Sequence, residues 1–345
     1  MKVKHMQAAI LMEQKKPLVI DKVELPDKLD FGQVLVKVHY SGICGSQLGE
    51  IDGVKGPDPY LPHLLGHEGV GVVVEIGPHV TNVKVGDNVV LHWRPGKGIQ
   101  SSPPKYKYKE KTLNAGFVTT FNEYAIVSEN RITSIPPDID KETASLFGCA
   151  ITTGFGVVEN NAKIKIGESV VVFGSGGIGL SIIQAASLVS AYPIIAIDRF
   201  NKRLELSSEL GATHIINSSN EDARKKIVDI VGKNKLDVFI DNTGQPDIIN
   251  MGYKITKREG RVILVGVPNF DRNISIHSLP LHFGKHLTGS HGGEVNPTLD
   301  IPRYYKLYDR YYLDRKINIE TCIEWIKGKK IFINNKLEYF SSKNT

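Results

Sequence analysis

Cysteine is scarce in this chain: three stand among 345 residues, far apart at positions 44, 149 and 322. Thiols so few and so widely spaced do not make the disulfide framework of a small secreted domain. Long apolar runs are missing too, because none approaches the ~20 residues of a membrane-spanning helix, and residues 1–20 lack the apolar core of a signal peptide. We therefore expect a cytoplasmic protein that is not attached to a membrane.

A large excess of charge of one sign is also absent. The chain has 43 lysines and arginines against 37 acidic residues, which gives a net charge of +6. So mild an excess, without any nucleic-acid-binding motif, argues against nucleic acid as a partner and leaves small molecules. The hydrophobic fraction of 41% and the charged fraction of 23% are ordinary, and 345 residues are enough for two domains with cores of their own.

The most informative stretch, residues 170–198, reads VVVFGSGGIGLSIIQAASLVSAYPIIAID. A short apolar run, a glycine turn, apolar positions at helical spacing and a second apolar run follow one another, in the order of a dinucleotide-binding unit. Gly174 makes the tight turn, Gly176 lets the backbone approach a pyrophosphate, and Gly179 allows the helix to pack closely on the strand. This order predicts an α/β domain that binds a dinucleotide.

An acid at the end of the second run indicates which dinucleotide binds. Asp198 stands 19 residues after Gly179, where a carboxylate holds the adenosine ribose hydroxyls and repels a 2′-phosphate. We therefore expect NAD, although Arg199 is a residue type that can serve NADP. Further candidate cofactor contacts are Gly177, Ile178, Arg203, Val265 and Val267.

Four possible metal ligands each lie in a glycine-containing turn: Cys44 in GICG, His67 and Glu68 in GHEG, and Cys149 in GCA. Taken singly, a cysteine is most often buried and inert, and a histidine is more often structural than a ligand. Taken together they stand out, because each lies in a glycine-rich turn at the end of an element, although no short zinc-finger spacing links them.

Six segments carry a resemblance to a known family: GICGS, GHEGVGVVVEIGPHVTNVKVGD, GCAITTGFGVV, VFGSGGIGLS, ELGATHIIN and RVILVGVP. With them the chain resembles the zinc-dependent medium-chain alcohol dehydrogenases from residue 5 to about residue 295. The resemblance implies a mainly β GroES-like catalytic domain at residues 1–150 and 292–345. It also implies a Rossmann domain, with a doubly wound parallel sheet, at residues 151–291. The implied activity is hydride transfer between NAD and an alcohol, whether a primary alcohol, a polyol or a sugar-like compound.

The resemblance also implies roles for single residues. Cys44, His67 and Cys149 would hold one catalytic zinc, and Glu68, ranked below them, would lie close to the metal and exchange as a ligand. Ser46 would pass on the proton of the alcohol. Thr153 would lie against the nicotinamide. By their position alone, four residues are candidates to face the substrate: Ser46, Trp93, Phe121 and His291, the last with a structural role as the alternative.

The chain departs from the family pattern at two places near these residues. Gln47 stands where the family usually has an Asp that orients the zinc-bound histidine; an amide oxygen can accept the imidazole N–H but does not raise its basicity as a carboxylate does. Gly49 stands where a distal relay histidine is usual, so the proton would pass to the ribose, Glu50 or Asp52.

A third departure is the loop of residues 91–116, which lacks the four cysteines of a structural zinc lobe. We expect one zinc per chain and a loop held by packing of Trp93, Tyr106 and Tyr108. Its KYKYKEK segment is expected to be a solvated face, with recognition of an anionic substrate as the alternative.

Two other readings of the whole chain stay open at this point: a zinc-free enzyme like the quinone reductases, and a non-enzymatic NAD-binding or scaffold protein. We also expect a homodimer or homotetramer, joined through an exposed sheet edge near residues 261–267. Residues 34–40 alternate apolar and polar side chains, which predicts a strand with one solvated face.

Overall fold

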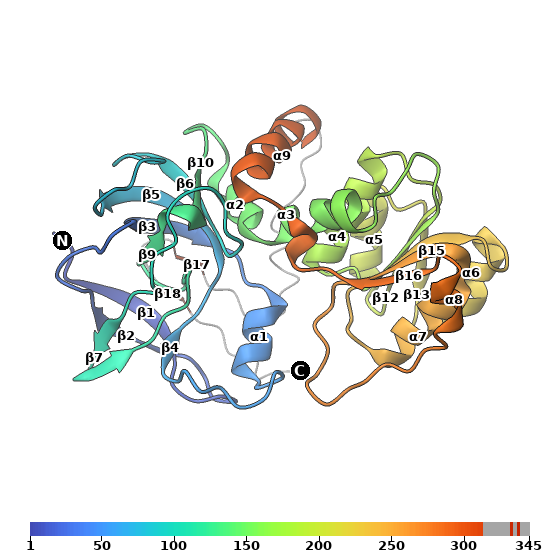
Figure 1. Cartoon of the computed structure of the whole chain (residues 1–345), viewed down its shortest axis with the longest axis horizontal. Helices are drawn as coiled ribbons and strands as arrows, with labels where there is room; N and C mark the ends of the chain where they lie inside the picture. The colour runs from blue at the N-terminus through green and yellow to red at the C-terminus, as the bar shows by residue number, and fades with distance from the viewer. Residues whose placement is uncertain (313–331, 334–336, 339–345) are drawn as a thin grey trace. The chain divides into compact units, whose positions relative to one another are not determined.

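The computed structural model of the chain describes residues 1–312, 332–333 and 337–338 (Figure 1). Two compact units can be distinguished, one made of Met1–Thr152 with Asn296–Thr345 and the other of Thr153–Val295. Cys322 lies outside the described residues. Among the residues described, every helix is too short or too polar to cross a membrane.

Two five-stranded sheets form the body of the first unit. One has the strand order β4-β1-β2-β7-β8 and the other β10-β6-β5-β3-β9. The strands of the first sheet are β1 (His5–Leu11), β2 (Val19–Glu24), β4 (His63–Leu64), β7 (Tyr106–Tyr108) and β8 (Lys111–Leu113). Those of the second are β3 (Gln33–Ser41), β5 (Glu68–Ile76), β6 (Asn88–His92), β9 (Tyr124–Ser128) and β10 (Ile132–Ser134).

Strand β3 carries apolar side chains on both of its faces. Val34, Val36 and Val38 pack in one cluster with Val89. Leu35, on the opposite face, is 1% exposed and packs with residues of β1 and β2 in another cluster. The expected solvated face is therefore wrong for this part of β3, because the first sheet covers it.

Four short helices accompany these strands: α1 (Gly45–Ile51), η1 (Glu129–Arg131), α2 (Lys141–Ser145) and η2 (Leu146–Gly148). The 16-residue helix α9 (Pro297–Tyr312) belongs to the same unit. Asp140 caps α2 by accepting the N–H of Thr143 at 2.9 Å, which satisfies one of the donors that a helix start leaves unpaired. Strands β17 (Phe332–Ile333) and β18 (Leu337–Glu338) pair antiparallel with each other.

The basic KYKYKEK segment forms the β7–β8 hairpin, and two of its lysines pair with acidic residues of β2. Lys107 lies 3.6 Å from Glu24 and Lys109 lies 3.2 Å from Asp21. The Tyr108 hydroxyl donates to Asp21 at 2.8 Å. These acidic partners favour a solvated, ion-paired face over an anion-binding one.

One buried carboxylate fixes the cysteine-free loop before this hairpin. Glu129 is 1% exposed and accepts the backbone N–H groups of Thr81 at 2.6 Å, Asn82 at 2.7 Å and Ile99 at 2.9 Å. Burial alone would raise the pKa of Glu129, but these donors outweigh it and hold the pKa below its usual value. Tyr106 and Tyr108 are buried in the core as expected, whereas the part played by Glu129 was not foreseen.

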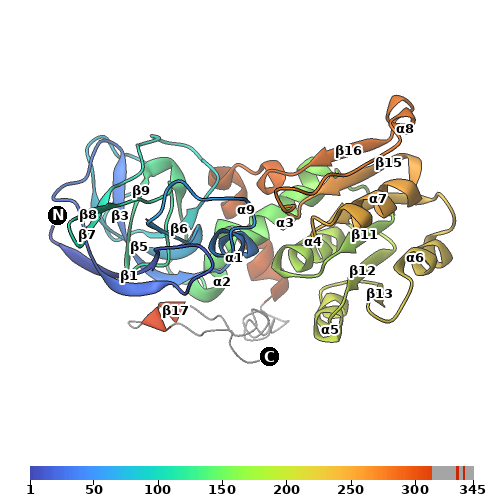
Figure 2. The ribbon, with the colours of Figure 1, turned by 90° about the horizontal axis from the view of Figure 1, so that it is seen from below.

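A six-stranded parallel sheet forms the centre of the second unit. Its strands succeed one another in the order β13-β12-β11-β14-β15-β16 (Figure 2). They are β11 (Val170–Phe173), β12 (Ile194–Asp198), β13 (His214–Asn217), β14 (Leu236–Asp241), β15 (Thr256–Leu264) and β16 (His286–Gly289). Counted from β11 this is the order 3-2-1-4-5-6 of a Rossmann sheet, so the predicted doubly wound parallel sheet is confirmed.

Helices between these strands belong to the same unit. They are α4 (Gly177–Leu188), α5 (Asn201–Glu209), α6 (Ala223–Val231), α7 (Pro246–Ile255), α8 (Leu279–His282) and the turns η3 (Val157–Asn161) and η4 (Gly292–Glu294). Helix α3 (Ala150–Gly156) contains the boundary between the two units.

The open edges of this sheet differ from the predicted one. Strand β15 pairs with β14 on one side and with β16 on the other, so residues 261–267 do not form an edge. The edge is β16, whose sequence HLTG has too few apolar residues to stand out as a strand.

Candidate metal centre and dinucleotide-binding turn

Three turns of the first unit bring the candidate metal ligands together. Cys44 precedes α1, His67 precedes β5, and Cys149 lies between η2 and α3. The turns require glycine: a Cβ at Gly66, where φ is +94°, would come within 2.3 Å of Thr120 Oγ1, and one at Gly148 within 2.3 Å of the Leu91 carbonyl oxygen.

One possible ligand atom each from Cys44, His67 and Cys149 lies within 4.8 Å of the others. Within the described residues this is the group of three or more ligand side chains that could hold a metal ion. The Nε2 atom of His67 is buried and has no hydrogen-bond partner. Two thiols and one imidazole, whose Nε2 is the nitrogen without a partner, fit a zinc site with an open fourth position.

Neighbouring groups within the cluster shift the pKa values of Cys44 and His67 in opposite directions. A hydrogen bond from Cys149 is the largest influence on Cys44, and with those of His67 and Ser46 it holds the pKa of the Cys44 thiol well below its usual value, against the effect of burial. Burial alone would lower the pKa of His67, but the neighbouring Cys44, Glu68 and Glu50 raise it. The site therefore favours a thiolate at Cys44, which is the form that binds metal.

Glu68 follows His67 but does not belong to the three-residue cluster. Its side chain is 2% exposed, and its carboxylate accepts the N–H of Ala150 at 3.1 Å. A Cβ at Gly42 would meet this carboxyl group at 2.6 Å. Burial, followed by the charge of Cys44, raises the pKa of Glu68 to about 8. In this structure Glu68 therefore ties β5 to the turn that carries Cys149.

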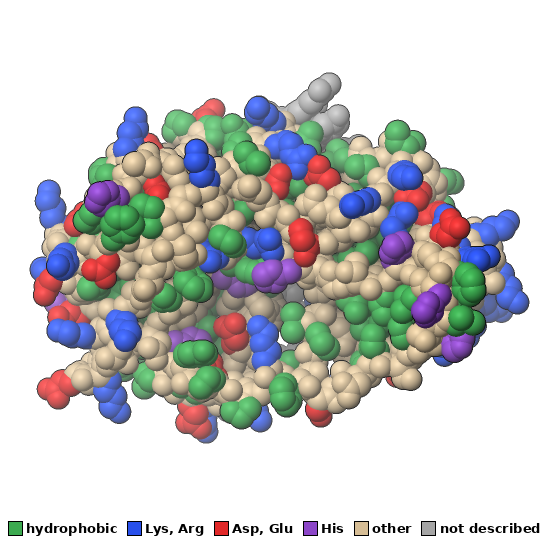
Figure 3. All heavy atoms as spheres, viewed as in Figure 1, with side chains coloured by type: hydrophobic (Ala, Val, Ile, Leu, Met, Phe, Trp, Pro, Cys, Tyr) green, Lys and Arg blue, Asp and Glu red, His purple; other side chains and the backbone are tan. Residues whose placement is uncertain are grey.

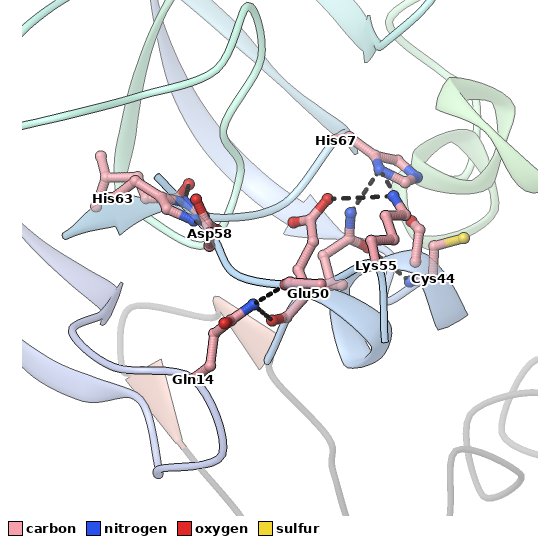
Figure 4. Close-up of polar contacts among 11 residues, drawn as sticks. Gln14, Cys44, Glu50, Lys55, Asp58, His63 and His67 are labelled. Atoms are coloured by element: carbon pink, nitrogen blue, oxygen red, sulfur yellow. Dashed lines mark hydrogen bonds and ion pairs between the residues drawn. The ribbon is translucent and has the colours of Figure 1, made fainter. Parts of the chain in front are cut away.

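Two residues of α1 contact the other face of His67. Gln47 Oε1 accepts the backbone N–H of Cys44 at 3.1 Å, while Gln47 Nε2 lies 2.5 Å from Nδ1 of His67. Ser46 Oγ lies 3.5 Å from the same Nδ1. Glu50, whose charge acts on His67, pairs with Lys55 at 3.8 Å (Figure 4). Gln14 hydrogen-bonds the carbonyl oxygens of Glu50 and Gly56, which ties the end of α1 to the loop after β1.

The predicted substrate residues lie in different surroundings. Trp93 has its ring centre 6.4 Å from that of His67, so it borders the cluster. Phe121 is 1% exposed and packs with Ala9, Leu11 and Leu65, which favours a core role over substrate contact. His291 is exposed at the start of η4.

His92 was missed by the sequence reasoning, because a histidine at the end of a strand carries no distinctive signal. It is 1% exposed and lies opposite Glu68 in the β5–β6 pair. Its Nδ1 is 2.7 Å from the carbonyl oxygen of Arg94 and its Nε2 is 2.9 Å from Thr133 Oγ1. Burial lowers the pKa of His92 to about 4, so it is neutral, donates from Nδ1 and accepts at Nε2.

The glycine turn of the second unit joins β11 to α4 by a close approach of backbone to backbone. Gly174 has φ of +94°, and a Cβ at Gly179 would come within 2.0 Å of the Gly174 carbonyl oxygen. Asp198 ends β12 and accepts the N–H of Ser175, inside the turn, at 2.8 Å. Its other oxygen accepts the N–H of Arg199 at 2.7 Å. The carboxylate is thus held against the turn, where a ribose would lie.

The other predicted cofactor residues lie around the same turn or elsewhere in this unit. Arg203 Nη1 is 3.4 Å from Asp198. Gly177 and Ile178 open α4, and Val265 follows β15, with its N–H donating to Asp241 at 2.8 Å. Val267 is 56% exposed, and Thr153 is buried in α3.

Comparisons with known proteins agree with this arrangement. Residues 30–137 match the family described as the alcohol dehydrogenase GroES-like domain, and residues 177–310 match the family described as zinc-binding dehydrogenase. The first match confirms the GroES-like domain expected from the sequence.

Among relatives, an S-(hydroxymethyl)glutathione dehydrogenase of Escherichia coli O1:K1 is 33% identical over 326 residues, which is 86% of this chain and 87% of the relative. That of Synechocystis is 32% identical over 324 residues, again 86% and 87% of the two chains. Among solved structures, the benzyl alcohol dehydrogenase of Acinetobacter calcoaceticus is 30% identical, with a TM-score of 0.81 over 91% of this chain and 92% of that one. The 2R,3R-butanediol dehydrogenase of Bacillus subtilis is 29% identical, with a TM-score of 0.71 over 89% of each chain.

Proposed function

Because the chain belongs to the zinc-dependent medium-chain alcohol dehydrogenase family, we propose that it transfers a hydride between an alcohol and NAD, giving an aldehyde or ketone, with one catalytic zinc per chain. The observation that carries the proposal is the cluster of Cys44, His67 and Cys149 with its orphaned ring nitrogen. Their two thiolates and one imidazole would hold the ion. A zinc bound there supplies Lewis acidity, which lowers the pKa of an alcohol and polarises a carbonyl group.

Removal of the alcohol proton falls to Ser46 in this proposal. Ser46 is the hydroxyl-bearing residue two positions after Cys44, and Gly49 offers no side chain that could take its place. Glu50 follows Ser46 by one helical turn of α1, so the two share a face of the helix. Since Glu50 is partly exposed and paired with Lys55, it offers the proton a route to solvent.

Preference for NAD is proposed from Asp198. Its carboxylate is 6% exposed and accepts one backbone N–H of the glycine turn, that of Ser175, besides those of Arg199 and Phe200. A 2′-phosphate at this place would meet the carboxylate at close range, and the cost of that repulsion would outweigh the attraction of Arg199 and Arg203.

The substrate class is proposed only as an alcohol that is primary, polyol or sugar-like. Relatives named for S-(hydroxymethyl)glutathione, benzyl alcohol and butanediol support a broad choice of this kind. The cytoplasmic location that we propose agrees with Cys44 and Cys149 being thiols rather than a disulfide, because a reducing compartment preserves thiols.

The test is metal analysis together with a steady-state assay using NAD and a panel of primary alcohols, polyols and sugars. We expect one zinc per chain and turnover of at least one alcohol, both lost in Cys149→Ala. In the same assay Ser46→Ala should keep zinc and lose ~100-fold in kcat, whereas Ser46→Thr stays close to wild type.

Each rival function makes a different forecast for these measurements. A quinone-reductase-like enzyme would turn over without zinc, and a scaffold protein would bind NAD without turning over any alcohol. An active Ser46→Ala enzyme would remove Ser46 from the mechanism while leaving the zinc proposal intact.

A further inference from the structure

Gln47 bridges two of the three residues that could hold the metal. It is the third residue of α1 and is 2% exposed. Through Oε1 it accepts the N–H of Cys44 at 3.1 Å, and through Nε2 it reaches Nδ1 of His67 at 2.5 Å. The bond to Cys44 satisfies one of the donors that a helix start leaves without a partner. The amide oxygen is thereby already engaged.

This arrangement fixes where the proton of the neutral imidazole lies. An amide nitrogen only donates, so Nδ1 of His67 accepts and the ring proton is on Nε2. Nε2 is the buried nitrogen that lacks a hydrogen-bond partner, on a ring that neighbours the Cys44 thiol. A protonated Nε2 has no lone pair to give to a metal ion.

Metal binding through Nε2 demands the opposite tautomer. The proton then lies on Nδ1, where it faces the NH₂ group of Gln47, so one donor points at another. If the amide is rotated by 180°, Oε1 faces Nδ1 of His67 and accepts its proton. The NH₂ group then faces the N–H of Cys44, so two donors again point at each other. The amide has one oxygen for two N–H groups, and Ser46 Oγ, at 3.5 Å from Nδ1, is too far for a strong bond.

We propose that Gln47 is a positioning residue that lowers the zinc affinity of this site, because its single acceptor oxygen cannot serve both Cys44 N–H and the metal-binding form of His67. A carboxylate at position 47 has two acceptor oxygens and would serve both. The inference rests on the proposed function in that Cys44, His67 and Cys149 must hold zinc. The enzyme would therefore release zinc to a chelator more readily than its Gln47→Glu variant.

The experiment is an equilibrium competition for zinc between the metal-free full-length chain and a chromophoric chelator. The variants are Gln47→Glu, which is isosteric and adds an acceptor, and Gln47→Met, which removes the donor without adding an acceptor. Cys149→Ala serves as the control that destroys the site. We expect Gln47→Glu to bind zinc at least ~10-fold more tightly than wild type and Gln47→Met to bind no more tightly than wild type.

Melting temperatures of the metal-free and zinc-loaded forms give a second readout. A buried carboxylate should make metal-free Gln47→Glu less stable than wild type, yet its gain in melting temperature on adding zinc should be larger. If Gln47→Glu does not fold, Gln47→Asp takes its place with the same expectation.

The outcomes separate the two proposals. Equal or weaker zinc binding by Gln47→Glu, with wild type binding zinc and Cys149→Ala not, overturns the role of Gln47 alone. If wild type, Gln47→Glu and Cys149→Ala all fail to bind zinc, the zinc site itself is refuted and the role of Gln47 with it. Zinc binding by Gln47→Glu but not by wild type would support the inference strongly.

Discussion

Buried polar side chains hold the surroundings of the candidate metal centre in place, and His92 is the clearest case. Both of its ring nitrogens are engaged, one with Arg94 and one with Thr133. The first of these bonds anchors the backbone beside Trp93, which in turn borders His67. A neutral histidine at this position thus links pH to stability.

The pH dependence has a definite sign. The pKa of His92 is about 4 in the folded chain and ~6.5 when unfolded, so unfolding takes up a proton between these values. The free energy of unfolding should therefore fall by about 2 kcal/mol between pH 7 and pH 5 from this residue. Denaturant titrations at the two pH values should show a shallower fall in His92→Asn than in wild type. His5→Asn, an exposed control, should leave the fall unchanged, and an unchanged fall in His92→Asn would contradict the prediction.

Sequence reasoning could single out Cys44, His67 and Cys149, because each stands in a glycine turn whose local pattern is distinctive. It also placed the amide of Gln47 beside the histidine, but with the oxygen toward the imidazole, whereas in the structure Oε1 accepts the N–H of Cys44 and Nε2 faces His67. The carboxylate of Glu129 was not foreseen, because its partners lie 30 or more residues away and only the fold brings them together. Phe121 stays a predicted substrate contact, and the structure adds that its ring is buried against Ala9, Leu11 and Leu65.

Among the elements, the β11–α4 turn depends on close approach of helix and strand. Gly179 lies against the carbonyl oxygen of Gly174, whereas Gly177, two residues earlier in the same helix, has open space around it. The two glycines therefore have different physical reasons to be there. This makes Gly177 a matched control for Gly179.

Adding one methyl group should separate these roles. In Gly179→Ala the Cβ would lie 2.0 Å from a backbone oxygen, so we expect a loss of about 1–3 kcal/mol in stability and weaker NAD binding. Gly177→Ala should fold as well as wild type, since alanine is favoured by about 1 kcal/mol over glycine in a helix. Thermal unfolding measures the first effect and NAD titration the second. Equal stability of the two variants would contradict this prediction, since the backbone around Gly174 would then have moved to accommodate the added methyl group at little cost in free energy.

Element types were easier to foresee than sheet edges. The run VVVF predicts β11 directly because four branched or aromatic residues stand together. The HLTG segment of β16 gives no such signal, and it forms a strand because β15 offers it a row of unpaired backbone groups. The edge of the sheet therefore lay one strand beyond the predicted one.

At the scale of the whole molecule, the open edge at β16 is a candidate contact between copies of the chain. Leu279 and Phe283 beside it are 53% and 50% exposed, and hydrophobic side chains gather over α8 on the face drawn in Figure 3. An exposed strand edge with apolar neighbours is a hazard for a monomer and a natural place for a symmetric contact.

We expect light scattering to give a mass of two or four times 38.1 kDa at micromolar concentration. Leu279→Asp should shift the population toward the monomer, because it puts a charge beside the edge. Leu299→Asp is the control, since Leu299 is 67% exposed but lies in the first unit. A monomeric wild type, or equal effects of both changes, would contradict the prediction.

The carboxylate of Glu129 has a practical consequence for spectroscopy. It accepts the backbone N–H groups of residues 81, 82 and 99 and the hydroxyl of Thr81, and we expect these bonds to keep the loop in shape when metal is removed. Stripping the protein with a chelator should then leave it folded and ready to accept cobalt(II), whose thiolate bands are visible where zinc is silent. The colour would then report on the metal environment of Cys44, His67 and Cys149, the one candidate cluster among the described residues.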